Sequence, residues 1–303
     1  MSTPIGASAD TTTGTAGTAG TAGTTGTADT AATADTAGTA KTVLEVLGLY
    51  RTYGSVRAVD DVSFRLAEGG SLGIVGESGS GKTTTARIVV GLEHADEGRV
   101  LIHGRDRGEH ARGKARRLAR AREVQMVFQD PFLSLDPRTT VGAALRETLA
   151  LHFPGADHAH RITELLEQVG LGSREADALP RQLSGGQRQR VAIARALAVE
   201  PAVLVLDEAV AALDVSVQAQ ILNLLFDIRE QTGVGYLFIT HDLGVVRCVT
   251  DDVIVMRSGR IVESGPTQQV LADPQHPYTR LLLESVPRPG WDPRGIAAAR
   301  RAL

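Results

Sequence analysis

The chain has 303 residues and a formal net charge of −3. Residues 6–40 contain only Gly, Ala, Ser, Asp and Thr. Their three aspartates and lack of basic residues account for the whole net charge, so residues 41–303 are formally neutral. A neutral body argues against a protein built mainly to hold nucleic acid. The sequence contains no run of about 18 apolar residues, so it predicts no membrane span. The single Cys248 excludes an intrachain disulfide and a metal or iron–sulfur site of several cysteines, and it indicates a reducing compartment.

Residues 1–41 are predicted to be disordered. Their small polar side chains and alanines cannot bury enough apolar area to offset the entropy of ordering the backbone. The segment also lacks the basic start and apolar run of a secretory signal. We therefore expect a flexible tether or tail.

Short β-prone runs separated by turn residues follow, and a glycine-rich loop comes after the last of them. The runs are Val43–Val46, Val56–Val59, Val62–Leu66 and Ser71–Val75. The loop consists of Gly76, Glu77, Ser78, Gly79, Ser80, Gly81, Lys82 and Thr83, and a helical pattern over Thr84–Leu92 succeeds it. Strand, glycine-rich loop and helix form the context of a triphosphate-binding loop, whose backbone N–H groups wrap the phosphates. Lys82 is expected to reach the β- and γ-phosphates, and the Thr83 hydroxyl to ligate Mg²⁺.

The middle of the chain is predicted to be mainly helical. After an expected strand at Gly98–His103, residues 105–122 hold eight basic and two acidic residues. A nucleic-acid or anionic-lipid patch and a solvated helix face both fit this run, and we favour the solvated face. A short strand at Glu123–Phe128 ends at Gln129, and a helical pattern over Val141–Val169 is interrupted near Pro154.

The pentapeptide Leu183–Gln187 precedes a helix predicted over Gly186–Ala198. Ser184 with Gln187 three residues later fits a helix capping box, with Gly185 and Gly186 between them. A helix start with two glycines is also an anion site. The pattern does not separate a well-capped helix from a site for a γ-phosphate presented by another subunit.

Two apolar runs, Ala202–Leu206 and Gly235–Thr240, have the character of parallel strands buried on both faces. Because ligands of open α/β sheets lie at the carboxyl ends of strands, the residues that follow these runs are candidates for the chemistry. Asp207 is expected to hold Mg²⁺, and Glu208 to orient or deprotonate an attacking water. His241 follows the second run and is expected to contact the γ-phosphate.

The C-terminal part is predicted to contain a hairpin and one helix. Val253–Met256 and Arg260–Glu263 flank Ser258-Gly259, a turn pair. The last 40 residues are Pro-rich, with a helical stretch near Tyr278–Ser285. No internal repeat is evident.

Together these motifs resemble the ATP-binding subunit of ATP-binding cassette transporters over about Leu44–Pro289. The matching residues, in family order, are Tyr53, Gly76–Thr83, Gln129, Leu183–Gln187, Asp207, Glu208, Asp214 and His241. The resemblance implies ATP and Mg²⁺ as cofactors and an α/β fold. That fold is a P-loop NTPase core, a mixed sheet with an antiparallel β subdomain, plus an inserted α-helical subdomain. It implies an ATPase domain over 42–264, a helical subdomain at about 130–190 and an extension over 265–303.

The resemblance also assigns roles that the residues alone do not settle. Tyr53 is expected to stack on adenine, with Tyr50 as the competing candidate. Thr84 is expected to touch phosphate, Gln129 to contact Mg²⁺ and the attacking water, and Asp214 to couple two opposed sites. Ser184, Gly185, Gly186 and Gln187 are expected to face the ATP of a second cassette subunit.

A narrower likeness points to the oligopeptide, dipeptide or nickel importer branch. It rests on Phe128–Arg138, Ala212–Leu225 and His276–Arg280. It implies two membrane permease subunits, an extracytoplasmic solute-binding protein, a paired cassette (a heterodimer favoured over a homodimer), no nucleic acid, and a place at the cytoplasmic face of the cell membrane. Two positions depart from the pattern: Ala209 replaces the usual Pro and Ala211 the usual Ser, which predicts a looser loop toward Asp214.

Two alternatives remain at this stage. One is a cassette ATPase that remodels DNA or ribosomes, although such chains usually carry a coiled-coil insertion or a second cassette. The other is a regulatory protein that binds ATP without turnover. Such a protein is expected to lack Glu208 or to carry a degraded Leu183–Gln187, and both are intact.

Overall fold

The computed structural model describes residues 41–108, 113–131 and 135–286. The expected disorder of the N-terminal segment, residues 132–134 of the importer-branch motif and the last part of the 265–303 extension lie outside the described residues.

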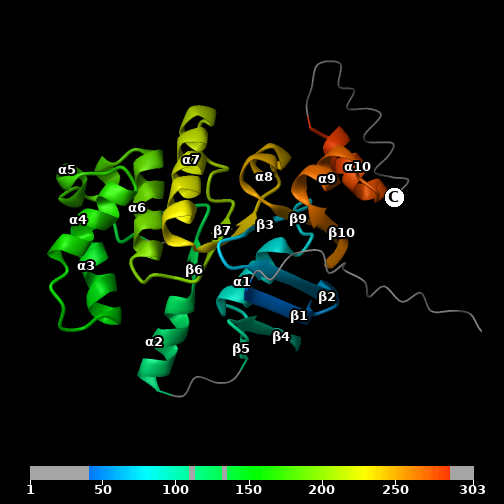
Figure 1. Cartoon of the computed structure of the whole chain (residues 1–303), viewed down its shortest axis with the longest axis horizontal. Coiled ribbons are helices and arrows are strands. Elements are labelled where there is room, and N and C mark those ends of the chain that lie inside the picture. Colours follow the sequence, from blue (N-terminus) through cyan, green and yellow to red (C-terminus); the bar gives the residue numbers. More distant parts are fainter. Residues whose placement is uncertain (1–40, 109–112, 132–134, 287–303) are drawn as a thin grey trace, which may run out of the picture. The chain divides into compact units, whose positions relative to one another are not determined.

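The central element is a six-stranded mixed sheet with the order β10-β9-β3-β8-β7-β6 (Figure 1). Every neighbouring pair is parallel except β9 and β10. Its strands are β3 (Ser71–Val75), β6 (Val124–Val127), β7 (Val203–Asp207), β8 (Gly235–Ile239), β9 (Asp252–Arg257) and β10 (Arg260–Pro266). The mixed sheet predicted from the sequence is therefore confirmed, and the carboxyl ends of β3, β6, β7 and β8 lie at one edge.

Apolar side chains on both faces explain the continuous hydrophobic runs of these strands. In β7, Val203 and Val205 belong to the core shared with the antiparallel sheet, whereas Leu204 and Leu206 belong to the core under the helices. Successive side chains of a strand point to opposite faces, so only a sheet covered on both sides accepts such a run.

A separate antiparallel sheet covers one face in the order β2-β1-β4-β5. It consists of β1 (Thr42–Tyr53), β2 (Val56–Ala67), β4 (Glu97–Ile102) and β5 (Arg105–Asp106). The two runs predicted around Val56–Val59 and Val62–Leu66 are one strand, which corrects the sequence interpretation. The register shifts there, with Leu49 opposite Val62 and Arg51 opposite Val59, and Asp61 has a φ of 58°. The turn-like pair of aspartates is a bulge within the strand.

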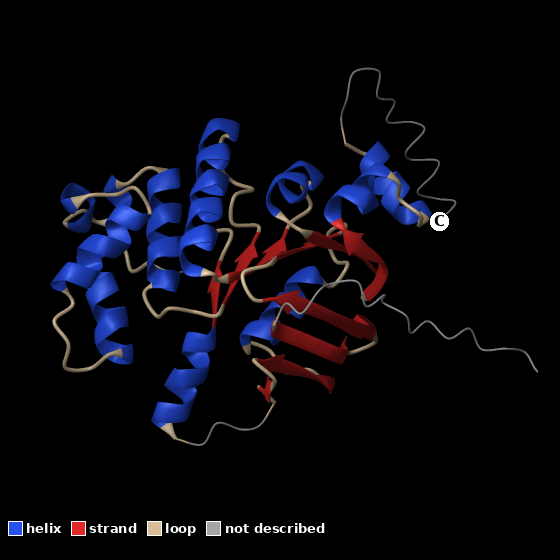
Figure 2. Cartoon of the chain, viewed as in Figure 1, coloured by secondary structure: helices blue, strands red, loops and turns tan. Residues whose placement is uncertain are grey.

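Helices account for most of the remaining described residues. Figure 2 shows most of them on the side of the mixed sheet away from the antiparallel one. The helix Lys82–Val90 is different, because Ala86, Ile88 and Val89 pack in the core that the two sheets share. The helices are α1 (Lys82–Val90), α2 (Lys114–Glu123), α3 (Val141–His152), α4 (Ala159–Gln168), α5 (Ser173–Ala176), the 3₁₀ turn η2 (Pro180–Gln182), α6 (Gly185–Leu197), α7 (Val215–Thr232), α8 (Leu243–Val249), α9 (Thr267–Ala272) and α10 (Pro277–Glu284). No helix of the described ranges is long and apolar enough to cross a bilayer.

The predicted helical insertion forms as a group of helices, α3 to α6. The single long pattern predicted over Val141–Val169 is two helices, and the break lies where Pro154-Gly155 interrupts it. The buried leucines and isoleucines of α3, α4 and α6 join one core with the inner face of α7. In the basic stretch, α2 has no buried residue, as a solvated helix face requires. Arg107, which precedes it, is partly buried and pairs with Glu123 at 3.1 Å.

The described part of the C-terminal region, up to residue 286, contains one helix more than the sequence indicates. The hairpin of β9 and β10 and the helix near Tyr278 are confirmed, and a further helix, α9, lies between them. Val270, Leu271 and Tyr278 are buried against Val253 and Val255 of β9. The extension therefore packs directly on the mixed sheet.

Candidate nucleotide site

The phosphate loop is held so closely that two of its glycines admit no side chain. A Cβ on Gly76 would lie 2.2 Å from the Met256 carbonyl oxygen, and one on Gly81 would lie 2.3 Å from that of Ala58. Their φ angles of 153° and 104° also disfavour other residues. Backbone from β9 and β2 thus fixes the loop from one side. The sequence predicted these glycines for backbone wrapping, and the structure adds the neighbours that require them.

Lys82 is buried at the first position of α1 and lies against the loop itself. Its Nζ donates to the carbonyls of Gly76 at 2.8 Å and Glu77 at 2.7 Å. Burial lowers the pKa of Lys82, and the carboxylates of Glu208 and Asp207 partly offset that shift. The ammonium is therefore placed where the loop surrounds it, opposite the acidic strand ends.

The other loop residues are distributed between exposed and packed positions. Ser78 and Gly79 are exposed, whereas Ser80 is buried and its carbonyl accepts from the Gly259 N–H at 3.0 Å. Thr84 lies half-buried in the first turn of α1. This leaves the tip of the loop accessible while its base is anchored to the turn between β9 and β10.

Thr83 and Asp207 meet across the gap between the loop and β7. The Thr83 hydroxyl donates to Asp207 Oδ1 at 3.4 Å. Burial raises the pKa of Asp207, the Glu208 carboxylate raises it further, and the Thr83 hydrogen bond opposes both. A hydroxyl and one carboxylate are the hard oxygen ligands that Mg²⁺ takes when it also binds phosphates. The Thr83–Asp207 pair therefore fits a Mg²⁺ ion that a nucleotide also ligates. Within the described residues, no group of three or more Asp, Glu, His or Cys side chains is placed to hold a metal ion.

Glu208 and His241 form the second pair at this edge. His241 Nδ1 lies 3.1 Å from Glu208 Oε1, and the side chains are 61% and 25% exposed respectively. Glu208 has a φ of 48°, a left-handed conformation that is costly for a residue with a side chain. Its N–H donates to the Ile239 carbonyl at 2.8 Å, so the end of β8 holds the turn. The strain directs the carboxylate toward the open edge and His241.

Gln129 and Tyr53 are less closely tied to the site. Gln129 is exposed two residues beyond the end of β6 and makes no hydrogen bond to Thr83, Asp207 or Glu208 among the described residues. Tyr53 is 40% exposed, its hydroxyl donates to the Glu93 carboxylate, and the Arg51 guanidinium lies 4.7 Å from its ring centre. Tyr50 is only partly exposed, so Tyr53 offers more ring surface to a base.

The pentapeptide forms the capping box that the sequence predicts. Ser184 Oγ accepts from the Gln187 N–H at 3.2 Å, and Gln187 Oε1 accepts from the Ser184 N–H at 2.9 Å. A Cβ on Gly186 would lie 2.5 Å from Val217 Cγ1, so this glycine has a packing reason of its own. No hydrogen bond or ion pair joins the pentapeptide to the phosphate loop within the described residues, and Figure 1 shows α6 and α1 in separate parts of the chain. Any shared site therefore requires another molecule.

Asp214 stands directly before α7 but does not cap it with its side chain. It is exposed and makes no cap hydrogen bond. Two turns close the loop that precedes it, from the Ala211 N–H to the Glu208 carbonyl and from the Leu213 N–H to the Val210 carbonyl. Asp214 is thus free to face a partner.

One site contact was missed by sequence reasoning. The Glu77 N–H of the phosphate loop donates to the Tyr278 hydroxyl at 3.0 Å, from a residue 201 positions away. The His276–Arg280 motif marked the segment, but no local pattern connects it with the loop.

Comparison with known proteins identifies the family of the chain. The family model described as "ABC transporter" matches residues 59–211, and "Oligopeptide/dipeptide transporter, C-terminal region" matches 262–302. The chain belongs to the ABC transporter family. The cassette MJ0796, solved as a dimer in a post-hydrolysis state with ADP and Pi, is 31% identical with a TM-score of 0.66, over 74% of this chain and 98% of that one. The P-loop NTPase core with its antiparallel and helical parts is confirmed by this likeness.

Curated relatives lie within the same family. A Brucella abortus protein, provisionally named a peptide import ATP-binding protein, is 51% identical over 77% of this chain and 70% of its own length. The glutathione import ATP-binding protein GsiA of Escherichia coli is 48% identical over 79% of this chain but 38% of its own length. This ABC cassette therefore spans well under half of GsiA.

Proposed function

We propose that this ABC cassette binds and hydrolyses ATP and powers the import of short peptides through partner membrane subunits. One observation carries the proposal: the buried ammonium of Lys82, the Thr83–Asp207 pair and the Glu208–His241 pair meet at the carboxyl edge of one sheet. A phosphate-binding loop, two oxygen ligands for one cation and an acid–base pair in one place are the groups that a phosphoryl-transfer site requires.

Each group has a part in hydrolysis that follows from its position. The loop amides and Lys82 bind the phosphates, and Lys82 offsets the charge that develops on them. Thr83 and Asp207, with Gln129, would hold Mg²⁺, which neutralises phosphate charge when bound. Glu208 accepts a proton from, or orients, the attacking water, and His241 fixes the carboxylate and contacts the γ-phosphate.

The pentapeptide supports a shared site between two cassettes. The first N–H groups of a helix lack intrahelical partners and carry its positive dipole end, and α6 begins at Gly185 with a capped, exposed start. The related cassette MJ0796 is a dimer in its ADP and Pi state. We infer that Ser184–Gln187 of one subunit closes on the ATP of another, a heterodimer being favoured, and that Tyr53 stacks on the adenine.

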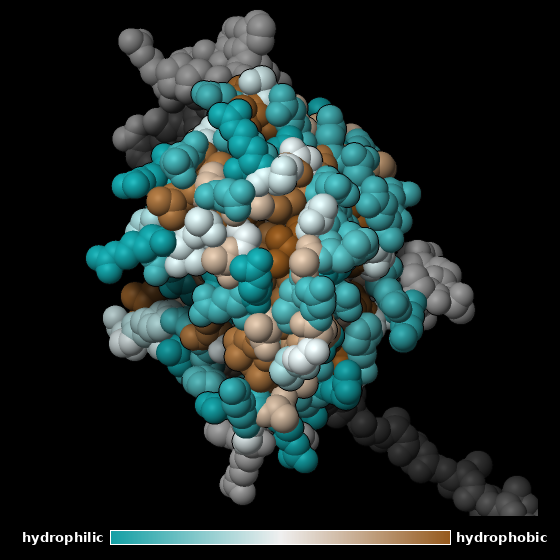
Figure 3. Space-filling model, turned by 90° about the vertical axis from the view of Figure 1, so that its left-hand side faces the viewer, coloured by the Kyte–Doolittle hydropathy of each residue, from teal (hydrophilic) through white to brown (hydrophobic). Residues whose placement is uncertain are grey.

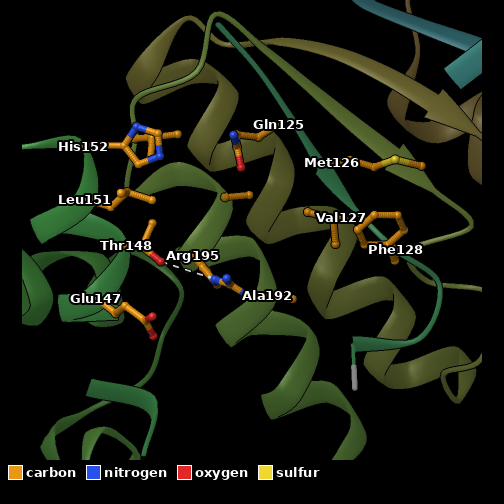
Figure 4. Close-up of a pocket in the computed structure, with 12 residues that line it drawn as sticks. Gln125, Met126, Val127, Phe128, Glu147, Thr148, Leu151, His152, Ala192 and Arg195 are labelled. Atoms are coloured by element: carbon orange, nitrogen blue, oxygen red, sulfur yellow. Dashed lines mark hydrogen bonds between the residues drawn. The ribbon is translucent and has the colours of Figure 1, made fainter. Parts of the chain in front are cut away.

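A groove beside the helical subdomain is the proposed seat for a membrane subunit. Figure 4 shows it between the end of α3, the C-terminal half of α6 and β6, with Arg195 donating to Thr148 across it at 3.3 Å. Its volume is about 350 Å³, and Leu151, Phe128 and Val199 contribute apolar surface. Phe128 directly precedes Gln129, the residue proposed to contact Mg²⁺ and the attacking water. Figure 3, which views the molecule from the side of the helical subdomain, shows apolar patches among hydrophilic side chains.

The cargo class comes from the C-terminal match and the relatives. The C-terminal region model is that of oligopeptide and dipeptide transporters, and the Brucella abortus relative is named for peptide import. GsiA is named for glutathione, itself a short peptide. We propose a peptide delivered by an extracytoplasmic binding protein to two permease subunits, with this chain at the cytoplasmic face of the membrane.

The decisive test is hydrolysis by the Glu208→Gln variant. We expect it to bind ATP as the wild type does, to lose turnover by 10²-fold or more, roughly what a general base contributes, and to form a nucleotide-trapped dimer. Glu230→Gln is the matched control, because it makes the same substitution at an exposed position on α7. ATPase activity that survives Glu208→Gln would contradict the role of Glu208.

Purification of the native complex tests the transport role. Membrane permease subunits that co-purify from a detergent extract support it. Recovery of ribosomes or DNA instead would favour the remodelling alternative, and a nickel-binding solute receptor would change the cargo.

A further inference from the structure

The C-terminal helix α10 reaches the phosphate loop through one side chain. Tyr278, at its second residue, is 3% exposed, and its hydroxyl accepts the hydrogen bond from the Glu77 N–H at 3.0 Å. The ring packs in a small core with Val75, the residue immediately before the loop, and with Val255 of β9. The bond therefore joins the start of the phosphate loop to the extension.

The position of the ring is fixed from several directions. The Arg257 guanidinium, at the end of β9, lies 5.0 Å from the ring centre. The Tyr278 N–H donates to His276 Nδ1 at 3.1 Å, and the His276 N–H donates to the Glu263 carboxylate at 3.1 Å. Because α10 is anchored to β10 in this way, the hydroxyl is held in place rather than free to follow the loop.

The contact lies where the loop leaves the sheet. Glu77 follows Gly76, where the Met256 carbonyl leaves no room for a Cβ, and the Glu77 carbonyl accepts from Lys82 Nζ at 2.7 Å. A single residue, Glu77, thus connects the Tyr278 hydroxyl, through its N–H, to the Lys82 ammonium, through its carbonyl. A shift of the Glu77 backbone would move the Lys82 contact with it.

We propose that Tyr278 is a positioning residue for the phosphate loop, and that through it nucleotide binding and the order of α10 are coupled. The inference rests on the proposed ATP binding and deepens it. Tyr278 touches no nucleotide; it acts through the Glu77 peptide. Since coupling between two sites is reciprocal, the extension tunes nucleotide affinity and nucleotide in turn stabilises the extension.

The test compares Tyr278→Phe with Tyr236→Phe in the full chain. Both variants remove one hydroxyl and keep the ring; Tyr236 is buried on β8 and donates to the Leu225 carbonyl at 2.8 Å, on the face of the sheet covered by α7. We expect Tyr278→Phe to weaken the Kd for fluorescent ATP about three- to tenfold, the effect of losing one typical hydrogen bond. We expect it to raise KM with little change in kcat. Tyr236→Phe is expected to lower the melting temperature and leave Kd unchanged.

Hydrogen exchange supplies the reciprocal readout. With ATP bound, the backbone amides of α10 are expected to exchange more slowly in the wild type and to lose that protection in Tyr278→Phe. Equal Kd values and equal α10 protection in a folded Tyr278→Phe chain would overturn the inference and leave ATP binding intact. A wild-type chain that binds no nucleotide would overturn the proposed function, and the inference with it.

Discussion

At the scale of single residues, two adjacent carboxylates at the end of β7 have different environments. Asp207 is held beside Thr83 in a partly buried position, whereas Glu208 turns through a left-handed conformation toward His241. Burial first, and the Glu208 charge second, raise the pKa of Asp207. A carboxylate whose pKa is raised by burial and by a like charge gains from a nearby cation, which is the arrangement expected of a cation ligand.

The Asp207→Asn variant is expected to be more stable than the wild type in the absence of nucleotide and inactive in hydrolysis. An acid whose pKa is raised in the folded state contributes stability while protonated and loses it as the pH rises through the raised pKa. The neutral amide avoids that loss, so its melting temperature should exceed the wild-type value at pH 7. The difference should shrink as the pH falls toward the ordinary Asp range, about 4.

Calorimetry or dye-monitored melting across pH 4–8 measures this difference. Asp227→Asn, on the exposed face of α7, is the matched control substitution. A pH-independent difference, or a less stable Asp207→Asn chain at pH 7, would contradict the assignment.

At the scale of elements, the start of α6 combines a structural role with a proposed role in binding. The reciprocal hydrogen bonds of Ser184 and Gln187 stabilise the helix in the isolated chain. The helix α3 offers a comparison, because Thr140 caps it through its side chain without belonging to any nucleotide motif. The two caps therefore separate helix stability from function.

Ser184→Ala and Thr140→Ala should each lower the free energy of unfolding by about 0.5–2 kcal/mol, the usual loss on removing an N-cap. Only Ser184→Ala should also reduce ATPase activity, by tenfold or more, and weaken ATP-dependent dimerisation. Denaturant unfolding, steady-state ATPase assays and analytical ultracentrifugation measure the three quantities. Equal ATPase losses in both variants would show that the pentapeptide acts only as a helix cap.

The elements that hold the site were the most predictable from sequence. Strands β3, β7 and β8 read as short apolar runs because both of their faces are buried, and the chemistry follows each run directly. Local sequence patterns gave wrong or missing predictions where contacts with a distant segment of the chain determine the structure. Asp60-Asp61 looked like a turn, but pairing with β1 makes it a bulge. The helix α9 was missed because six residues carry too little periodicity, although Val270 and Leu271 bury it.

At the scale of the whole described chain, long-range contacts complete the site. The Glu208–His241 pair joins residues 33 positions apart. The sequence predicted that each residue follows a buried strand, and the pairing of β7 with β8 in the structure brings the two together. The Glu77–Tyr278 hydrogen bond joins residues 201 positions apart, the second of them on a C-terminal helix. No sequence pattern in either segment predicts this contact. The buried strands could be predicted from their apolar runs, whereas the docking of the extension depends on side-chain packing between distant segments.

The groove beside α3 gives a prediction about assembly. Leu151 lines it and is 48% exposed, while Leu92, beyond the end of α1, is 59% exposed and lies outside it. Glutamate at 151 would place a charge in a partly apolar seat near Glu147, so Leu151→Glu should reduce co-purification of membrane permease subunits at least tenfold. Leu92→Glu should leave co-purification unchanged.

Both variants should hydrolyse ATP as isolated chains at the wild-type rate, because neither residue touches the phosphate loop or the Asp207–Glu208 edge. Quantitative immunoblotting of permease subunits against the cassette measures retention, and a coupled assay measures turnover. The proximity of Phe128 to Gln129 adds a further expectation. Any permease that binds should alter the ATPase rate of the wild type, and Leu151→Glu should abolish that response. A Leu151→Glu chain that keeps its permeases and their effect on the rate would place the membrane subunit elsewhere on this cassette.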